Sequence, residues 1–431
     1  MSLLFTHADI VATNGGQFEY LRNAYLGVEG DTIDYIGVSA PLKQYSNSKN
    51  MSNHMLIPGL INCHGHSAMN LLKGMGSDLP LQEWLQIMWA TEDRMRDEDF
   101  VNGMNMAILE MLASGTTSFC DMYMRPSITQ KCIDESGIKA NLTRVMMGGD
   151  KHTDYRTYQN RLEALDFVRM YDGAFGDRLH ADWSVHAEYT IDPDIAQKWA
   201  AETTELGGRL HIHISETKRE HEECIERYGR TPVRWLEEKG FFKIPTYAAH
   251  CVWCTEDDLH VLQSHGVSVV HNPESNLKLG SGFAPIPRML ELGMNVALGT
   301  DGAASNNNLN MFEEMHVASI VHNGYTNDPV IMTPETILTM ATANGARVQG
   351  RNDTGSLEVG KKADIVAVNL DAPHMRPNLN PLALLTYSAQ GSDVTLTMVD
   401  GNILYENGEY ITMDKEKITY EFDASVRHLY G

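Results

Sequence analysis

The sequence predicts an α/β protein: a (β/α)₈ TIM barrel with a small β-sandwich domain formed by both chain ends. Three observations support this fold class. Apolar, strand-like runs alternate with stretches of helical length through the middle of the chain. Both ends contain short strand-like runs separated by turn signals. At 431 residues, the chain is long enough for one large domain and one smaller domain.

The two ends of the chain have the same β-rich character. Strand-like runs occupy residues 3–13 and 24–38, and a polar loop follows at 44–53. Near the other end, residues 362–370 and 394–410 read as strands and hairpins, with DGN and ENG turns. We therefore expect residues 1–56 and 360–431 to pair into one domain, with residues 57–359 forming the barrel.

Eight apolar runs in the middle of the chain are separated by segments of helical length, such as 193–206 and 232–240. Repeated β-then-α order implies right-handed crossovers and a parallel sheet. An open sheet remains an alternative, but eight units favour a closed barrel. The eight runs are residues 55–64, 115–123, 139–147, 179–189, 209–216, 246–253, 266–273 and 294–302.

Composition limits the possible partners. The chain carries 34 Lys and Arg against 57 Asp and Glu, a net charge of −23, which repels nucleic-acid phosphates and anionic membranes. The first residues lack the pattern of a signal peptide, and no apolar run approaches the length of a membrane span. Six cysteines do not form a disulfide framework. We expect a cytoplasmic protein without nucleic-acid or membrane partners.

Polar residues cluster where the predicted strands end, which is where (β/α)₈ barrels carry their chemistry. Imidazoles and a carboxylate converging on one mouth are typical ligands of zinc or another first-row divalent ion. The residues are His64 and His66 after the first strand, His211, His213 and Glu216 at the fifth, His250 at the sixth, His271 at the seventh, and Asp301 and Ser305 at the eighth.

Each of these signals also has a structural interpretation. A histidine after a strand is often only hydrogen-bonded to its loop, TDG is usually a turn, and Ser305 could cap the following helix. Their joint occurrence at several strand ends favours a metal site. We expect one divalent ion per chain, with zinc favoured over iron(II) or manganese(II).

Several stretches resemble the amidohydrolase superfamily, and within it the deaminases of adenosine-type nucleosides that act on 5′-methylthioadenosine and S-adenosylhomocysteine. The resemblance covers nearly the whole chain. It implies hydrolytic deamination of such nucleosides to inosine-type products plus ammonia, and a homo-oligomer is expected. The stretches are PGLINCHGH, LQEWL, HIHISET, AAHCVW, HNPESNLKLGSGFAPI, GTDGAASNNNLNMFEEM and GSLEVGKKADIVAV.

The resemblance also implies roles for individual residues. The metal ligands would be His64, His66, His213 and Asp301, and the acid/base groups would be Glu216, His250 and Asp301. Glu83 would hold the ribose hydroxyls, His186 would lie near the sugar, and Arg144 would reach toward the 5′ substituent. Arg156 and Ser305 are further candidates for substrate binding.

The residues themselves support the same chemistry. A bound metal lowers the pKa of water to about 7, and the resulting hydroxide would attack the amine-bearing carbon of the base. Asp301 can accept the water proton while His250 orients the hydroxide. Glu216, three residues beyond a ligand, could carry a proton to the ring nitrogen and then to the leaving amine.

Alternatives remain open at this level. The fourth strand segment, RLHADWSVHAEYT, lacks a lysine that could bridge two metals, which favours a mononuclear site, although Glu188 is a conceivable substitute. In the family this segment commonly reads PHSPY, so VHAEY leaves the preferred 5′ group open. Other possibilities are deamination of guanine or another nucleobase, hydrolysis of chloro-s-triazines, and a catalytically silent metal-binding scaffold. Glu83 and Arg144 favour a nucleoside over a bare base.

Overall fold

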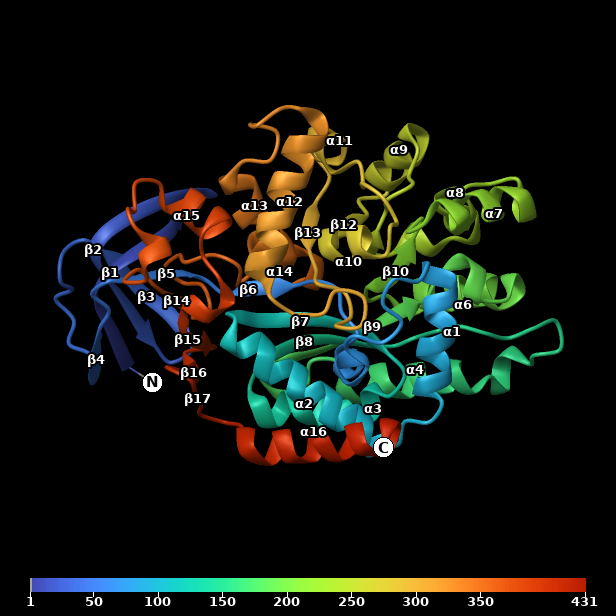
Figure 1. Ribbon diagram of the computed structural model, residues 1–431, viewed down its shortest axis with the longest axis horizontal. Helices are drawn as coiled ribbons and strands as arrows, with labels where there is room; N and C mark the ends of the chain where they lie inside the picture. The colour runs from blue at the N-terminus through green and yellow to red at the C-terminus, as the bar shows by residue number, and fades with distance from the viewer. Residues whose placement is uncertain (1) are drawn as a thin grey trace.

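The computed structural model describes residues 2–431, so Met1 of the expected N-terminal segment lies outside the described residues. Two sheets organise the chain. Figure 1 shows the strands from the two chain ends gathered at one end of the molecule, beside a larger body in which helices surround a second sheet.

The sheet inside the larger body contains eight parallel strands in strict chain order, which confirms the predicted barrel. The barrel is nearly closed. The amide of Cys63, just after the first strand, donates a hydrogen bond to the carbonyl of Leu298 in the eighth strand at 2.9 Å. The strands are β6 (Leu60–Asn62), β7 (Thr116–Tyr123), β8 (Lys139–Arg144), β9 (Leu179–Val185), β10 (Leu210–Ile214), β11 (Thr246–His250), β12 (Ser268–His271) and β13 (Val296–Leu298).

Helices follow the barrel strands and begin at recognisable caps. Asp192, Thr231, Thr255 and Thr333 each accept a backbone N–H in the first turn of the helix that follows. The helices are α1 (Leu81–Glu92), α2 (Asp97–Ala113), α3 (Pro126–Ser136), α4 (Gln159–Tyr171), α5 (Ala174–Asp177), α6 (Pro193–Leu206), α7 (Lys218–Tyr228), α8 (Pro232–Lys239), α9 (Glu256–Ser264), α10 (Pro273–Lys278), α11 (Ile286–Glu291), α12 (Met311–Thr326), α13 (Pro334–Ala341), α14 (Ala343–Gln349), α15 (Pro381–Tyr387) and α16 (Lys415–Tyr430).

Short 3₁₀ helices occur in the loops, and two of them lie near the carboxyl ends of barrel strands. They are η1 (Ser67–Leu72), η2 (Tyr155–Thr157), η3 (Glu188–Thr190), η4 (Phe241–Lys243), η5 (Pro373–Met375) and η6 (Gly391–Asp393). Of these, η1 follows the end of β6 and η3 follows the end of β9.

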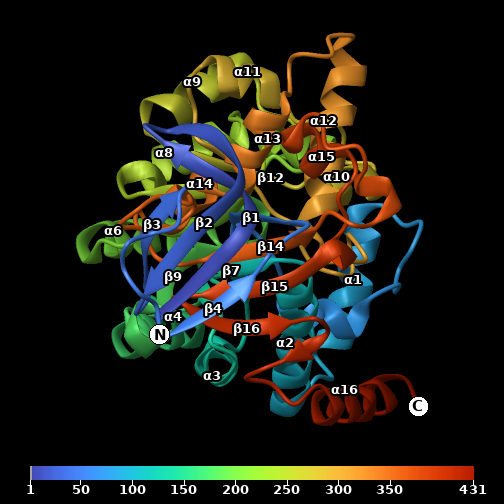
Figure 2. The same ribbon diagram turned by 90° about the vertical axis from the view of Figure 1, so that its left-hand side faces the viewer.

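The other sheet, outside the barrel, joins both ends of the chain, as predicted, and faces the viewer in Figure 2. Its link is β5, which pairs in parallel with β1 and antiparallel with β14. The nine strands form one mixed sheet: β1 (Ser2–Asn14), β2 (Gln17–Glu29), β3 (Thr32–Gly37), β4 (Asn47–Asn50), β5 (His54–Pro58), β14 (Ile365–Asn369), β15 (Val394–Val399), β16 (Asn402–Glu406) and β17 (Glu409–Tyr410).

The C-terminal segment also contains helices that leave this sheet and pack on the barrel. The last helix, α16, lies along α2, and both lie at the lower edge of Figure 1. The Asn102 side chain on α2 donates to the Glu421 carbonyl at 3.2 Å and to Ser425 Oγ at 3.0 Å. Near the end of the chain, the Tyr430 hydroxyl donates to the Leu71 carbonyl at 2.9 Å. The stretch from 415 onward therefore packs against the barrel and adds no strand to the sheet of the chain ends.

A buried ion pair connects the two sheets. Lys139, at the start of β8, places Nζ 2.7 Å from Asp364 Oδ2 and 2.7 Å from Asp400 Oδ1, and only 4% of its side chain is exposed. We expect Lys139→Ala to lower the free energy of unfolding by about 3–5 kcal/mol, because two carboxylates would remain buried without a partner. Urea denaturation followed by circular dichroism measures this change.

The control for this prediction is Lys417→Ala. Lys417 lies on α16, its side chain is 66% exposed, and its ion pair with Glu421 is on the surface. Equal losses in the two variants would contradict the assigned role of Lys139.

Among residues 2–431, no helix is both long and apolar enough to cross a lipid bilayer.

Candidate active site

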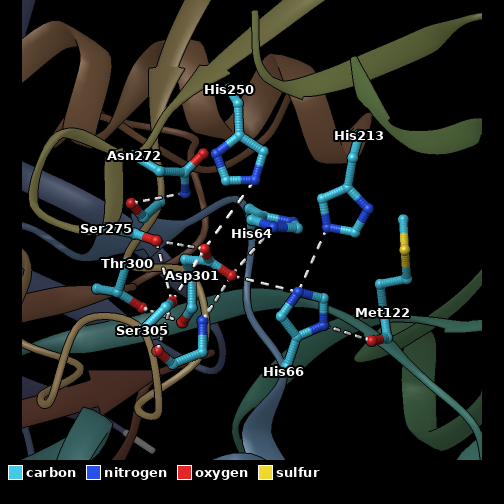
Figure 3. Close-up of polar contacts among 12 residues, drawn as sticks. His64, His66, Met122, His213, His250, Asn272, Ser275, Thr300, Asp301 and Ser305 are labelled. Atoms are coloured by element: carbon cyan, nitrogen blue, oxygen red, sulfur yellow. Dashed lines mark hydrogen bonds and ion pairs between the residues drawn. The ribbon is translucent and has the colours of Figure 1, made fainter. Parts of the chain in front are cut away.

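The four predicted metal ligands come together at the carboxyl end of the barrel (Figure 3). His64 and His66 follow β6, His213 lies in β10, and Asp301 follows β13. Asp301 Oδ1 lies 3.4 Å from His64 Nε2 and 3.2 Å from His66 Nε2. His213 Nε2 lies 3.4 Å from His66 Nε2. Three strands distant in sequence thus place three imidazole nitrogens and one carboxylate oxygen around one point.

Hydrogen bonds behind the rings orient these nitrogens. His66 donates Nδ1–H to the Met122 carbonyl at 2.7 Å, and His213 donates Nδ1–H to the His186 carbonyl at 2.7 Å. A histidine that donates from Nδ1 keeps an unprotonated Nε2 available for a metal. Both Nε2 atoms are directed toward the centre of the group in Figure 3.

His64 gives the clearest sign that the group is built for a ligand. Its Nδ1 is hydrogen-bonded to His211 Nε2 at 2.8 Å, which gives His211 a supporting role. Its Nε2 is fully buried and has no hydrogen-bond partner among the described residues. A buried nitrogen without a partner is costly, and a metal ion would satisfy it. The donor set of nitrogen and oxygen atoms fits zinc or another first-row divalent ion.

Burial keeps most of these rings neutral, which is the form that binds metal. Desolvation lowers the pKa of His64 to about 4 and holds the pKa of His213 well below its ordinary value. Burial alone would also lower the pKa of His66, but the neighbouring Asp301 carboxylate raises it to about 9. If His66 holds a metal ion, it must therefore first lose a proton from Nε2.

Asp301 is held in a defined orientation. Its Oδ2 accepts hydrogen bonds from Ser275 Oγ at 2.6 Å and Ser305 Oγ at 3.1 Å, which leaves Oδ1 facing the histidines. Burial would raise the pKa of Asp301, but the adjacent imidazoles of His64 and His66 keep the pKa well below its usual range. The carboxylate is therefore ionised and ready to bind a cation.

The two predicted acid/base groups, His250 and Glu216, lie next to the predicted metal ligands. His250 is hydrogen-bonded through Nδ1 to Asn276 Oδ1 at 2.8 Å. Its Nε2 lies 3.9 Å from Glu216 Oε2 and 4.0 Å from Asp301 Oδ2, between the two carboxyl groups. Burial raises the pKa of Glu216, which favours the protonated form that a general acid needs.

The backbone at the strand ends adopts unusual conformations. Ser215, His250 and Asp301 have φ values of 48°, 72° and 62°, a region that side-chain-bearing residues seldom occupy. Gly299 allows a close approach, since a Cβ there would lie 2.7 Å from the His64 amide nitrogen. Such strain is typical of functional sites held by the surrounding fold.

The site opens into a cavity with a mostly apolar wall. The acidic members of the wall besides Glu216 and Asp301 are Glu92 and Asp93, near the end of α1. None of the described residues that line the cavity is a lysine or an arginine. The aromatic and aliphatic wall consists of Trp84, Trp89, Tyr123 and Tyr189, Met69, Met122, Met124 and Met147, and Leu81, Leu85, Val145 and Leu279.

Of the five predicted substrate-binding residues, the structure places two in the cavity wall. His186 and Ser305 both line it. His186 lies after β9, with its ring centroid 4.9 Å from that of His213.

The structure does not bring Glu83, Arg144 and Arg156 to the cavity. Glu83 lies on the exposed face of α1, because the helical period turns Trp84 and Leu85 inward instead. Arg144 is tied down by α4, to Glu163 and to Asn160, at 2.7 Å each. Arg156 is exposed in η2.

Glu188, the conceivable bridging ligand of the fourth strand, does not take that role here. Its carboxylate accepts a hydrogen bond from Arg227 on α7 at 2.6 Å, and it does not line the cavity. Burial raises the pKa of Glu188 to about 7 in spite of that arginine. The VHAEY stretch thus contributes His186 and Tyr189 to the cavity and turns the Glu188 carboxylate toward α7.

Several residues of the site were not predicted from the sequence. Ser275 and Asn276, in the HNPESN stretch after β12, orient Asp301 and His250. Their position just after a predicted strand was the available signal. The cavity residues Trp84, Trp89, Glu92 and Asp93 had no signal beyond lying in a helix after a strand. His271, one of the strand-end histidines of the sequence, does not line the cavity. Its Nε2 is hydrogen-bonded to His322 Nε2 at 3.0 Å.

We expect Asn276→Ala to lower kcat/KM by about 10–100-fold without loss of metal, because His250 would lose the acceptor that orients its ring. Steady-state kinetics with parallel metal analysis measures both quantities. Asn276→Asp keeps an acceptor oxygen and should retain more activity. An unchanged rate in Asn276→Ala would contradict this role.

A (β/α)₈ barrel with buried histidines, an aspartate and acid/base groups at its carboxyl end is the architecture of a metal-dependent hydrolase. The chain belongs to the amidohydrolase family, whose family model matches residues 55–404.

Similar proteins are known over nearly the full length of the chain. A 5-methylthioadenosine/S-adenosylhomocysteine deaminase of Acetivibrio thermocellus is 38% identical over 425 residues, 97% of each chain. A 5′-deoxyadenosine deaminase of Methanosarcina acetivorans is 39% identical over 411 residues, 95% of this chain and 94% of that one. The crystal structure of an adenosine deaminase from Xanthomonas campestris with bound zinc superposes with a TM-score of 0.92 at 30% identity. It covers 99% of this chain and 98% of that one.

Proposed function

We propose that this protein is a metal-dependent aminohydrolase that deaminates adenosine-type nucleosides to inosine-type products and ammonia. The observation that carries the proposal is the placement of Glu216 and His250 beside the His/Asp ligand group, facing a cavity. A purely structural metal site has no use for such acid/base groups. The relatives named as deaminases of methylthioadenosine, S-adenosylhomocysteine and 5′-deoxyadenosine support the substrate class.

We propose that His64, His66, His213 and Asp301 hold one divalent ion per chain. Zinc is the ion we favour, because the donor set suits it and the similar adenosine deaminase structure contains it. When bound, the ion would lower the pKa of a water molecule to about 7 and so supply a nucleophile at neutral pH.

The protein's own groups would then move the protons. The Asp301 carboxylate accepts the proton of the attacking water. His250, whose Nδ1 is held by Asn276, presents Nε2 toward the same oxygen and orients it. The Glu216 carboxyl protonates the purine ring nitrogen as the carbon becomes tetrahedral. The Glu216 carboxylate then takes the remaining proton of the attached hydroxyl and passes it to the amine, so the C–N bond breaks, ammonia leaves and a carbonyl remains. The proton held by Asp301 restores the Glu216 carboxyl for the next cycle.

The cavity geometry supports His186 and Ser305 as substrate contacts. Contact by Glu83 would require α1 to rotate or move, since the side chain is exposed. Contact by Arg144 would require it to leave Glu163 and Asn160, and Arg156 would have to reach in from η2. The division into 1–56 with 360–431 and 57–359, a homo-oligomeric state and a cytoplasmic location are also proposed.

The test is ammonia release by metal-quantified protein from adenosine, 5′-deoxyadenosine, 5′-methylthioadenosine, S-adenosylhomocysteine, guanine and cytosine. We expect turnover of adenosine analogues, loss of activity after chelation, and recovery with about one equivalent of zinc. Turnover of a free base alone would favour a nucleobase deaminase. No turnover of any adenosine analogue by metal-replete protein would overturn the proposal.

A further inference from the structure

The cavity wall beyond the metal-ligand group has a distinctive chemical character. If the reacting carbon of the purine lies at the ligand group, the rest of the nucleoside must extend along the remaining wall. There Met124, Val145 and Met147 combine with Trp84 and Trp89 in an apolar surface. The acidic side chains of this part of the wall are two carboxyl groups, Glu92 and Asp93, and none of its described residues is a lysine or an arginine.

Glu92 is already engaged within the protein. It is buried and accepts a hydrogen bond from the Tyr123 hydroxyl at 2.5 Å. Asp93, the next residue, is exposed. Neither carboxyl group carries a positive charge that could pair with an anion.

The arginine expected to supply a positive charge lies behind the cavity wall. Val145 and Met147 line the cavity, whereas Arg144 points toward α4. Its Nε donates to Glu163 Oε2 and its two terminal nitrogens donate to Asn160 Oδ1 and the Val145 carbonyl, each at 2.7 Å. Asn160 also donates to the Met147 carbonyl at 2.9 Å, which ties this loop to α4. The guanidinium is therefore satisfied by the protein and only 11% exposed.

We infer that this cavity selects nucleosides whose 5′ substituent is uncharged and apolar, such as hydrogen or an alkylthio group, over those with an amino-acid tail. The inference rests on the proposed function and narrows its substrate class. The ammonium group of a zwitterionic tail would lie near the carboxyl groups of Glu92 and Asp93. The carboxylate of the same tail would find no lysine or arginine among the described residues of the wall. On binding, the tail carboxylate would give up its hydration shell to contact methionine and tryptophan side chains, and no partner would offset this loss of binding free energy.

The test compares kcat/KM of the full-length, zinc-loaded protein for 5′-methylthioadenosine, 5′-deoxyadenosine and S-adenosylhomocysteine, with adenosine as reference. We expect the value for S-adenosylhomocysteine to be at least about tenfold lower than for 5′-methylthioadenosine, mainly through KM. Equal efficiency on these two nucleosides would overturn the selectivity and leave the proposed function intact. No ammonia from any of the four would overturn both.

Two variants test the cause of the selectivity. Met147→Arg places a cation in the wall and should raise the ratio of S-adenosylhomocysteine to 5′-methylthioadenosine turnover, whereas the neutral polar control Met147→Gln should not. Arg144→Gln should leave this ratio unchanged. A selective loss of S-adenosylhomocysteine turnover in Arg144→Gln would overturn the inference. Because both substrates are measured on one preparation, partial unfolding cancels from the ratio.

Discussion

Replacement of Asp301 by asparagine is expected to abolish catalysis, with kcat/KM falling by more than about 1,000-fold, together with loss of bound metal. Asp301 Oδ1 is the only carboxylate oxygen within 3.5 Å of both His64 and His66 Nε2 among the described ion pairs. The amide would remove a negative ligand and the proton acceptor at the same position. Metal content by mass spectrometry and steady-state ammonia release measure the two effects separately.

The matched control is Asp257→Asn, which makes the same chemical change on the exposed surface of α9. It should retain both metal and activity. Circular dichroism of the two variants shows whether the fold survives. A folded Asp301→Asn protein with full metal content and near-normal turnover would exclude Asp301 from both roles.

Replacement of Glu216 by glutamine should lower kcat by about 10²–10⁴-fold while metal remains bound. The amide keeps the size of the side chain but cannot carry a proton between water, ring nitrogen and amine. Glu216 is buried beside His250, at 3.9 Å, and it is not one of the residues in the ligand groups. Retained metal with lost turnover is therefore the distinctive signature.

Glu222→Gln provides the comparison for this variant. Glu222 lies on α7, its side chain is 63% exposed, and it pairs only with Lys218 on the surface. It should match the wild-type protein in kcat and metal content. If Glu216→Gln lost metal in proportion to activity, Glu216 would be supporting the ligand group and not transferring protons.

The fold was predictable because its signals are local. Each barrel strand is a short apolar run. The alternation of strand and helix implies parallel pairing, and the count of eight units favours a closed barrel over an open sheet. The final helix was not predicted. Residues 415–430 follow a strand-rich stretch, and their docking on α2 depends on contacts with a segment more than 300 residues earlier.

The residues around the cavity were harder to predict than the ligands. Ser275 and Asn276 act only through Asp301 and His250, so their value depends on where β11, β12 and β13 bring those groups. Glu83 directly precedes Trp84 in the chain, and Trp84 lines the cavity. The rotation of α1 about its own axis decides which of the two faces inward, and sequence spacing does not specify that rotation.

The sequence by itself determined the barrel and the positions of His64, His66, His213, His250 and Asp301, because each of these residues lies at or just after the end of a strand. Parallel strands in a barrel share one edge, so residues at their ends must converge. Only the tertiary structure decided which other side chains face the cavity. Arg144 satisfies its donors on α4 and leaves methionine in the wall, since a buried guanidinium binds wherever neighbouring elements offer acceptors.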